Sequence, residues 1–240
     1  MNKLITILAL TFTMNWAGAF DHSQLVQILK TYVNDAGLVS YSTLKANRDT
    51  LDSYLETTGA VSRSTFDAWG EDEQLAFLIN LYNAETLQFI IDNYPISSIK
   101  KLGGLFSTPW DKKTVTLFGE TTTLNHLEHK VIRKNYPEPR IHFALVCAAV
   151  GCPPLRNEAF AAGKLDAQLD DQARTFLSQT TKNRIEGDTL YLSSIFDWYG
   201  DDFTTGEITI NDYVAPYMVG DASGKKVKFT DYDWSLNDQK

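Results

Sequence analysis

The spacing of apolar residues along the chain predicts a mainly helical fold. From Ser23, apolar side chains recur three, four, seven and eight positions apart, which predicts an amphipathic helix that ends near Gly37. Asn125 and Glu128 have the spacing of a capping box, which predicts a helix that runs to about Lys134. Similar apolar spacing predicts further helices at 43–57, 62–68, 164–179, 195–199 and 208–218.

The segment 71–93 predicts the strongest helix of the chain. Its first turn is acidic, which complements the helix dipole, and Tyr94-Pro95 ends it. Apolar residues surround it almost completely from Leu75 to Leu81. We therefore expect this helix to be buried on most of its sides.

Two asparagines, Asn80 and Asn83, lie inside this apolar run, one turn apart and on the same side of the helix. A buried amide without a partner costs about 1–3 kcal/mol, so each asparagine needs a hydrogen-bond partner. Two interpretations remain open. The asparagines either tie neighbouring loops to the helix or line a pocket that faces the segment 139–156.

Strand patterns are fewer and shorter. Alternating residues predict hairpins at 114–123 and 184–192 and a strand at 226–229, and the short apolar run 140–149 predicts a buried strand. Together with the helices, these strands predict a helix-rich α+β domain with a small, mainly antiparallel sheet.

The predicted strand at 140–149 carries much of the candidate chemistry. Alternation along a strand would place His142 and Cys147 on opposite faces. Cys152 follows beyond the strand, in a stiff turn that ends in two prolines.

The first residues have the pattern of a secretory signal peptide. Lys3 precedes an apolar stretch at 4–14, and Ala17-Gly18-Ala19 follows as a cleavage site. The apolar stretch is about half of the roughly 20 residues that a membrane-spanning helix needs. We expect a signal peptide at 1–19 that is removed, no later membrane insertion, and a periplasmic or secreted protein.

The remaining chain, 20–240, is expected to form a single domain, because no linker, repeat or long run of like charge divides it. An apolar fraction of 43% is sufficient for a large core. The net charge of −8 and the absence of clustered lysine and arginine argue against a nucleic-acid partner. The expected partner is a small molecule or peptide, and the oligomeric state stays open.

No metal or cofactor is expected from the sequence. His126 and His129 share one face of the predicted helix, but they do not form an H-E-x-x-H motif. A zinc site needs three or four protein ligands. A site built from His129, His142 and Glu128 is a minor alternative.

Four stretches together resemble one known family. They are AFLINLYNAETL at 76–87, LEHKVIR at 127–133, PRIHFALVCAAVGCPPLR at 139–156 and DYDWSLN at 231–237. Their order is that of the domain of unknown function 547 family, found in bacteria and plants. The chain differs in carrying Leu78 where such proteins often have tryptophan. The resemblance implies no defined activity, but it implies that the family's motif residues are Asn80, Asn83, Glu128, His129, Arg140, His142, Cys147, Cys152, Arg156 and Asp233.

One functional hypothesis is a thiol-dependent hydrolase or transferase with Cys152 as the nucleophile. A nearby positive charge, such as Arg156, lowers the pKa of a thiol. His142 or His129 would act as the base, although the spacing does not support a direct pair of His142 and Cys152. Asp233, Asn80 or Glu128 would orient the base. The order of elements also resembles, loosely, the papain and transglutaminase arrangement. In that fold the central helix carries the nucleophile, whereas here it carries asparagine.

The alternative is a ligand-binding or interaction domain with a disulfide between Cys147 and Cys152. Export would make the pairing of these two cysteines possible. A disulfide that closes so short a loop stabilises the fold only modestly. Polar side chains would then form a site for an anionic or amide-bearing ligand, with these candidate ligand-binding residues: Asn80, Asn83, Arg140, Arg156 and Asp233.

Overall fold

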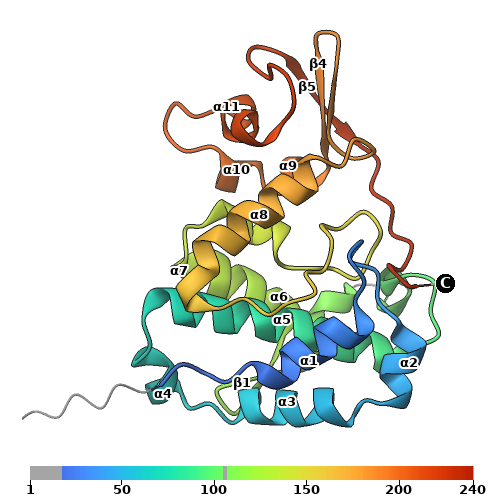
Figure 1. The fold of residues 1–240 in the computed structure, drawn as a ribbon, viewed down its shortest axis with the longest axis vertical. Helices are drawn as coiled ribbons and strands as arrows, with labels where there is room; N and C mark the ends of the chain where they lie inside the picture. The colour runs from blue at the N-terminus through green and yellow to red at the C-terminus, as the bar shows by residue number, and fades with distance from the viewer. Residues whose placement is uncertain (1–17, 105–106, 240) are drawn as a thin grey trace, which may run out of the picture.

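The computed structural model describes residues 18–104 and 107–239, so the predicted signal segment up to residue 17 lies outside the described residues. The long helix α5 (Glu71–Asn93) lies at the centre, with other helices around it (Figure 1). It is buried on almost every side from Leu75 to Ile91, as its apolar pattern predicts. The extended backbone of Tyr94, which precedes Pro95, ends the helix.

Four helices precede α5. The first three share one apolar cluster with it, and the fourth packs through Phe66 in a second cluster. The first helix ends at Tyr32, earlier than predicted, because Val33 is extended and pairs with Val39. The predicted helix at 43–57 is two helices, since the Asn47 side chain bonds to the carbonyl of Thr43 and the chain turns there. The four helices are α1 (Ser23–Tyr32), α2 (Tyr41–Ala46), α3 (Asp49–Gly59) and α4 (Arg63–Asp67).

The sheets are small, and both predicted hairpins are confirmed. One hairpin turns at Phe118 and Gly119, where both residues have positive φ, as a type I′ turn requires. In the other sheet β3 and β4 are antiparallel, and β5 pairs with β4 in the parallel direction. The strands are β1 (Lys113–Leu117), β2 (Glu120–Thr123), β3 (Arg184–Glu186), β4 (Thr189–Ser193) and β5 (Lys226–Thr230). The fold is therefore helix-rich α+β, as predicted.

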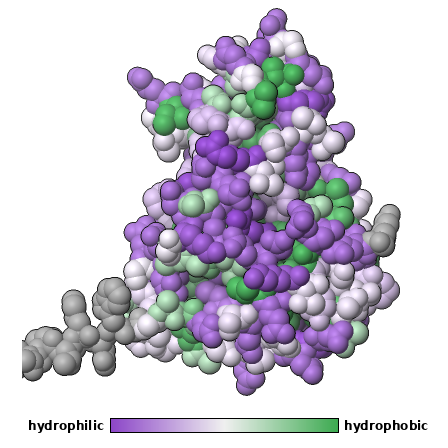
Figure 2. Space-filling view, viewed as in Figure 1, coloured by the Kyte–Doolittle hydropathy of each residue, from purple (hydrophilic) through white to green (hydrophobic). Residues whose placement is uncertain are grey.

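The C-terminal part of the chain forms a smaller lobe at one end of the molecule (Figure 1). Its core is an aromatic cluster that includes Phe143, Phe176, Phe196 and Phe203. The helices of this part are α8 (Leu165–Leu177), α9 (Ile195–Trp198), α10 (Gly200–Phe203) and α11 (Ile210–Val214). The surface seen in Figure 2 is mostly hydrophilic, with small and scattered apolar patches.

The predicted strand at 140–149 is wrong. Pro139–Phe143 is a short 3₁₀ helix, and the chain continues from there as an irregular loop to Cys152. The side chain of Asn83 supplies the hydrogen bonds that a neighbouring strand would have supplied, because it pairs with the backbone of Ala144 and Val146. The prediction that His142 and Cys147 point to opposite sides is wrong for the same reason, since both side chains line one pocket.

The predicted helix at 125–134 exists, but its middle is unusual. It begins as α6 (Leu124–His126), continues as a π-helical segment at Leu127–Ile132, and ends as α7 (Arg133–Asn135). Short π-helical segments occur frequently at functional sites. In the part of the chain that the structure describes, no helix is long and apolar enough to cross a membrane.

Candidate functional site

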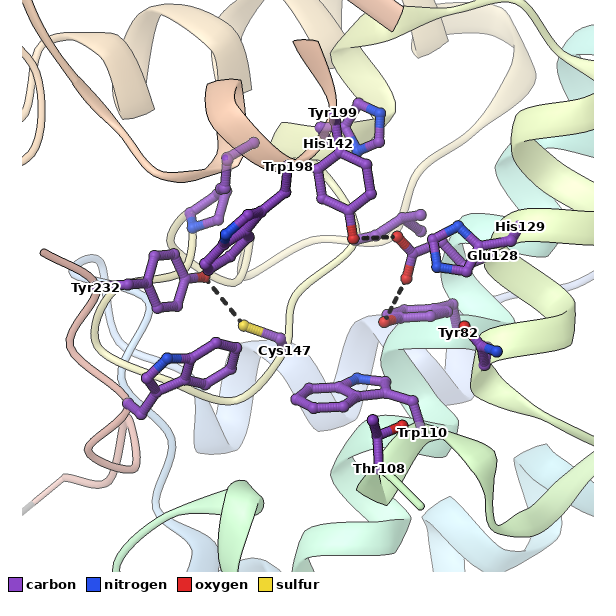
Figure 3. A pocket seen from close by; sticks show the side chains of 15 residues that line it. Tyr82, Thr108, Trp110, Glu128, His129, His142, Cys147, Trp198, Tyr199 and Tyr232 are labelled. Carbon is purple, nitrogen blue, oxygen red and sulfur yellow. Dashed lines mark hydrogen bonds between the residues drawn. The ribbon is translucent and has the colours of Figure 1, made fainter. Parts of the chain in front are cut away.

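A pocket of about 300 Å³ lies where the C-terminal lobe meets the helices around α5. Segments far apart in the sequence line it: α5, the π-helical segment, the loop before Pro153, α9 and the C-terminal tail (Figure 3). The lining is predominantly aromatic, with the side chains of Tyr82, Trp110, Trp198, Tyr199, Tyr232 and Trp234.

Glu128 is the acidic centre of this pocket. The residue is 8% exposed, and its carboxylate accepts hydrogen bonds from the hydroxyls of Tyr82 at 3.0 Å and Tyr199 at 2.9 Å. Burial, and then the neighbouring Glu128, raise the pKa of both tyrosines well above the ordinary value. Both phenols therefore stay protonated at neutral pH and remain donors to the carboxylate (Figure 3).

His129 follows Glu128 on the π-helical segment and also lines the pocket. Its Nδ1 lies 2.9 Å from Nη1 of Arg133. Because a guanidinium only donates, Nδ1 of His129 is the acceptor, and the neutral ring carries its proton on Nε2. Arg133 thus fixes the tautomer of His129.

His142 belongs to the same network through Asp202. Its Nε2 lies 2.7 Å from Oδ2 of Asp202, and Arg133 donates two further bonds to this carboxylate, at 2.6 and 2.8 Å. The bond from His142, followed by those from Arg133, holds the pKa of Asp202 well below its usual range. The ring of His142 also stacks on Tyr199, with centroids 4.1 Å apart. The two histidines are therefore held rigidly at one side of the pocket.

Cys147 and Cys152 form a disulfide. Cys147 is half-buried, lines the pocket, and places its Sγ 3.1 Å from the hydroxyl of Tyr232 (Figure 3). The prediction that Cys152 is the accessible sulfur is wrong, because Cys152 is only 2% exposed. Cys147 is the sulfur that faces the pocket. In this structure neither sulfur is a free thiol.

The two asparagines of α5 tie loops to the helix, the first of the two interpretations that the sequence left open. Asn80 donates to the carbonyl of Phe160 and accepts from its N–H, both at 2.9 Å. Asn83 donates to the carbonyl of Ala144 at 2.9 Å and accepts from the N–H of Val146 at 3.0 Å. Neither side chain lines the aromatic pocket.

The remaining three candidate ligand-binding residues also lie outside the pocket. Arg140 is paired with Glu138 and Asp166. Arg156 is paired with Glu158 and also with Asp171. Asp233 is exposed and bonds to Ser235. The structure therefore corrects the prediction that these residues share one site with His142.

The aromatic wall is what the sequence reasoning missed. Tyr82 lies between Asn80 and Asn83 in the stretch 76–87, but the predicted site included the two amides and not the tyrosine. The tail at 231–237 gave a usable signal, because it is unusually aromatic for a chain end. Within the described residues, no group of three or more histidine, cysteine or acidic side chains is placed to hold a metal ion.

Residues 66–177 match the family model described as "Protein of unknown function, DUF547". The chain contains a domain of the DUF547 family. The matched range is just under half of the chain and includes α5, the π-helical segment and both cysteines. It leaves out α9 and the tail, which bring Tyr199 and Tyr232 to the pocket of this DUF547 protein.

No curated protein and no solved structure matches the chain. The loose resemblance to papain and transglutaminase therefore stays a prediction.

Proposed function

We propose that this DUF547 protein is an exported ligand-binding protein whose aromatic pocket takes a small organic cation, such as an amine or a quaternary ammonium group. The observation that supports this proposal most directly is the position of Glu128, a carboxylate in a pocket lined by tryptophan and tyrosine rings. Aromatic faces attract cations, and cages of such rings are a recurrent way to bind quaternary ammonium groups.

The charge of the pocket favours a cation over an anion. Among the described residues that line it, Glu128 is the acidic one, and no lysine or arginine is present. Two cations in the described part of the chain lie beside the lining: Arg133, which is paired with an acidic side chain outside the pocket, is 4.9 Å from the ring centroid of Tyr199, and Lys100 is 5.0 Å from that of Trp234. A cation that enters would find one buried carboxylate and several ring faces, whereas an anion would meet the repulsion of Glu128.

A thiol-dependent hydrolase or transferase is the second candidate, favoured by the position of Cys147 in the pocket wall. Such an enzyme needs a thiolate, and both sulfurs are joined in the disulfide. The binding proposal requires no free thiol and is therefore compatible with the disulfide.

Two features support export. The segment 1–19 has the pattern of a signal peptide. The disulfide is typical of proteins that fold in oxidising compartments outside the cytosol. The predicted location is the periplasm or the exterior of the cell.

A fluorescence titration tests the binding proposal, because three tryptophans line the pocket. Tetramethylammonium chloride should give a saturable change in emission. Sodium chloride at the same ionic strength, and neopentyl alcohol as an uncharged near-isostere of the cation, should give none. Glu128→Gln, which keeps the shape but removes the charge, should weaken binding at least about tenfold, equivalent to roughly 1.4 kcal/mol.

The matched control is Glu120→Gln, which makes the same change at an exposed position on β2 and should leave the binding curve unchanged. Trp198→Ala offers a second variant, because Trp198 lines the pocket yet is 46% exposed, so its removal should spare the fold and weaken binding. Equal responses to the cation and to the uncharged isostere, or full binding by Glu128→Gln, would contradict the proposal.

A further inference from the structure

We propose that the Cys147–Cys152 disulfide is a thiol–disulfide exchange centre that opens into the aromatic pocket and accepts electrons from an external thiol. The proposal concerns a different chemistry from the binding of a cation and does not depend on it. It rests on three features of the two sulfurs: their unequal exposure, the donors around Cys152, and the hydroxyl beside Cys147.

The two sulfurs differ in their access to solvent. Cys147 lines the pocket and is half-buried, whereas Cys152 is 2% exposed and lies in the apolar core. Exchange begins when a thiolate attacks one sulfur of a disulfide, and accessibility decides which sulfur is attacked. An incoming thiolate therefore reaches Cys147, and Cys152 becomes the leaving group.

Cys152 is surrounded by groups that stabilise a thiolate. Its Sγ accepts hydrogen bonds from the backbone N–H of Cys147 at 3.1 Å and of Ala149 at 3.4 Å. Lys182 donates to the carbonyl of Cys152 at 2.6 Å, and although burial lowers the pKa of Lys182 to about 8, most of its ammonium is charged at neutral pH. Hydrogen-bond donors and nearby cations favour the thiolate, which makes a sulfur a better leaving group.

The loop between the cysteines is held in the shape that aims these donors. Ala148, which separates the two N–H groups, has a φ of 57°, a left-handed conformation that residues with a side chain rarely adopt. The N–H groups of Val150 and Gly151 bond to the tail at Ser235 and Asp233. The donors to Cys152 are thus part of a loop that is fixed from both sides.

A hydroxyl serves Cys147 in the same way. The hydroxyl of Tyr232 lies 3.1 Å from Sγ of Cys147. Burial raises the pKa of Tyr232, so the phenol keeps its proton and can donate. When Cys147 leaves as a thiolate in the second half of the exchange, this hydroxyl can stabilise it.

The exchange has two steps. An external thiolate attacks Sγ of Cys147, a mixed disulfide forms, the Cys147–Cys152 bond breaks, and the electron pair leaves on Cys152. A second external thiolate then attacks the external sulfur of the mixed disulfide and releases Cys147 as a thiolate. Two external thiols are oxidised to one disulfide, their two protons are transferred to the two cysteines, and the protein disulfide is reduced.

Single-cysteine variants of the full mature chain test this assignment. With oxidised glutathione as the probe, Cys152→Ser should form a mixed disulfide at Cys147 under native conditions, measured by mass spectrometry after acid quenching. The matched variant Cys147→Ser keeps only the buried sulfur and should react at least about tenfold more slowly. Equal rates for the two variants would overturn the assignment of Cys147 as the attacked sulfur.

The wild-type protein gives an independent readout that needs no cysteine substitution. Reduced glutathione should open the disulfide without denaturant while the tryptophan emission stays native. Acid quenching followed by alkylation in denaturant should then label both cysteines, including the buried Cys152. A disulfide that opens only when the protein unfolds would instead be a structural cross-link, and the proposal would fail. Glu120→Gln, at an exposed position on β2, should exchange at the wild-type rate. Exchange is measured by alkylation and cation binding by tetramethylammonium titration, so a failure of one can be told apart from a failure of the other.

Discussion

Glu85 and Glu128 are both buried carboxylates, yet their surroundings differ. Glu128 receives two tyrosine hydroxyls, whereas Glu85, which is 4% exposed, accepts a backbone bond from Thr116 at 3.2 Å. Burial raises the pKa of Glu85 to about 7, and the bond from Thr116 only partly offsets this. Glu85 therefore makes the free energy of unfolding depend on pH near neutrality.

We predict that Glu85→Gln stabilises the protein at alkaline pH and has little effect in mild acid. The folded protein holds a proton on Glu85 up to about pH 7, while the unfolded chain releases it near pH 4.3, so wild-type stability falls as pH rises through this window. The gain from Glu85→Gln should approach an upper limit on the order of 3 kcal/mol at about pH 8. Urea unfolding at about pH 5 and about pH 8 measures it.

The difference in the free energy of unfolding between variant and wild type removes the contributions of the other titrating groups, because these are the same in both proteins. Burial lowers the pKa of His22 to about 4, so His22 reduces stability as pH falls below about 6.5 in both proteins. Glu120→Gln, at an exposed position, should show no gain at either pH. A gain from Glu85→Gln that is the same at both pH values would mean that the carboxyl is ionised throughout.

At the scale of elements, α5 organises the site through two clamps on loops. Asn80 holds the backbone of Phe160, and Asn83 holds Ala144 and Val146 at the start of the loop that carries the disulfide. Each amide side chain donates one hydrogen bond and accepts one, as the backbone of a neighbouring strand would. The loop can therefore be irregular and still have its buried backbone groups paired.

We predict that Asn83→Leu lowers the free energy of unfolding by about 3 kcal/mol. Leucine fills a similar volume but leaves the carbonyl of Ala144 and the N–H of Val146 buried without partners, at about 1–3 kcal/mol each. Urea unfolding measures the loss. Asn93→Leu is the matched control, because Asn93 is exposed at the end of α5 and bonds within its own helix, so the change should be within about 0.5 kcal/mol. Similar losses for both variants would contradict the clamp.

The two long helices could be predicted from the sequence for different reasons. The apolar spacing at 164–179 matches the buried face of α8. The helix at 71–93 is apolar almost all round, and its acidic first turn, its length and Tyr94-Pro95 indicate α5 instead. The run 140–149 is short and apolar throughout, and such a run has no period that separates a strand from a buried loop. Its hydrogen bonds go to Asn83, and that partner is visible only in three dimensions.

The candidate site was predictable only in part, for a related reason. Glu128, His129 and His142 were singled out, and all three line the pocket. Tyr82 and Tyr199, which hold Glu128, come from segments 117 positions apart in the chain and carry no motif that links them. The π-helical turn that aims Glu128 has no signature in a capping box or an apolar period.

At the scale of the whole molecule, the C-terminal tail lines the pocket and is tied to the segment between α1 and α2. Tyr232 and Trp234 line the pocket, while the carbonyl of Asn237 accepts a bond from the N–H of Val39. The tail runs against the disulfide loop, where Leu236 pairs with Ala149. Its position therefore controls the shape of the pocket as well as the stability of the fold.

We predict that Gly151→Ala both destabilises the protein and weakens binding in the pocket. An added Cβ at Gly151 would lie 2.8 Å from the ring of Tyr232 and 2.9 Å from the backbone N and O of Asp233. Backbone atoms cannot move aside singly, so the tail must shift, at a cost of about 1–3 kcal/mol. Urea unfolding and the tetramethylammonium titration should both register the shift, because Tyr232 and Trp234 move with the tail.

Gly163→Ala is the control for this substitution, since a Cβ there meets no atom within 4 Å. It makes the same chemical change in the same chain and should leave stability within about 0.5 kcal/mol and binding unchanged. A Gly151→Ala protein that is less stable but binds tetramethylammonium normally would separate the two roles of the tail. In that case the tail would support the fold without shaping the binding site.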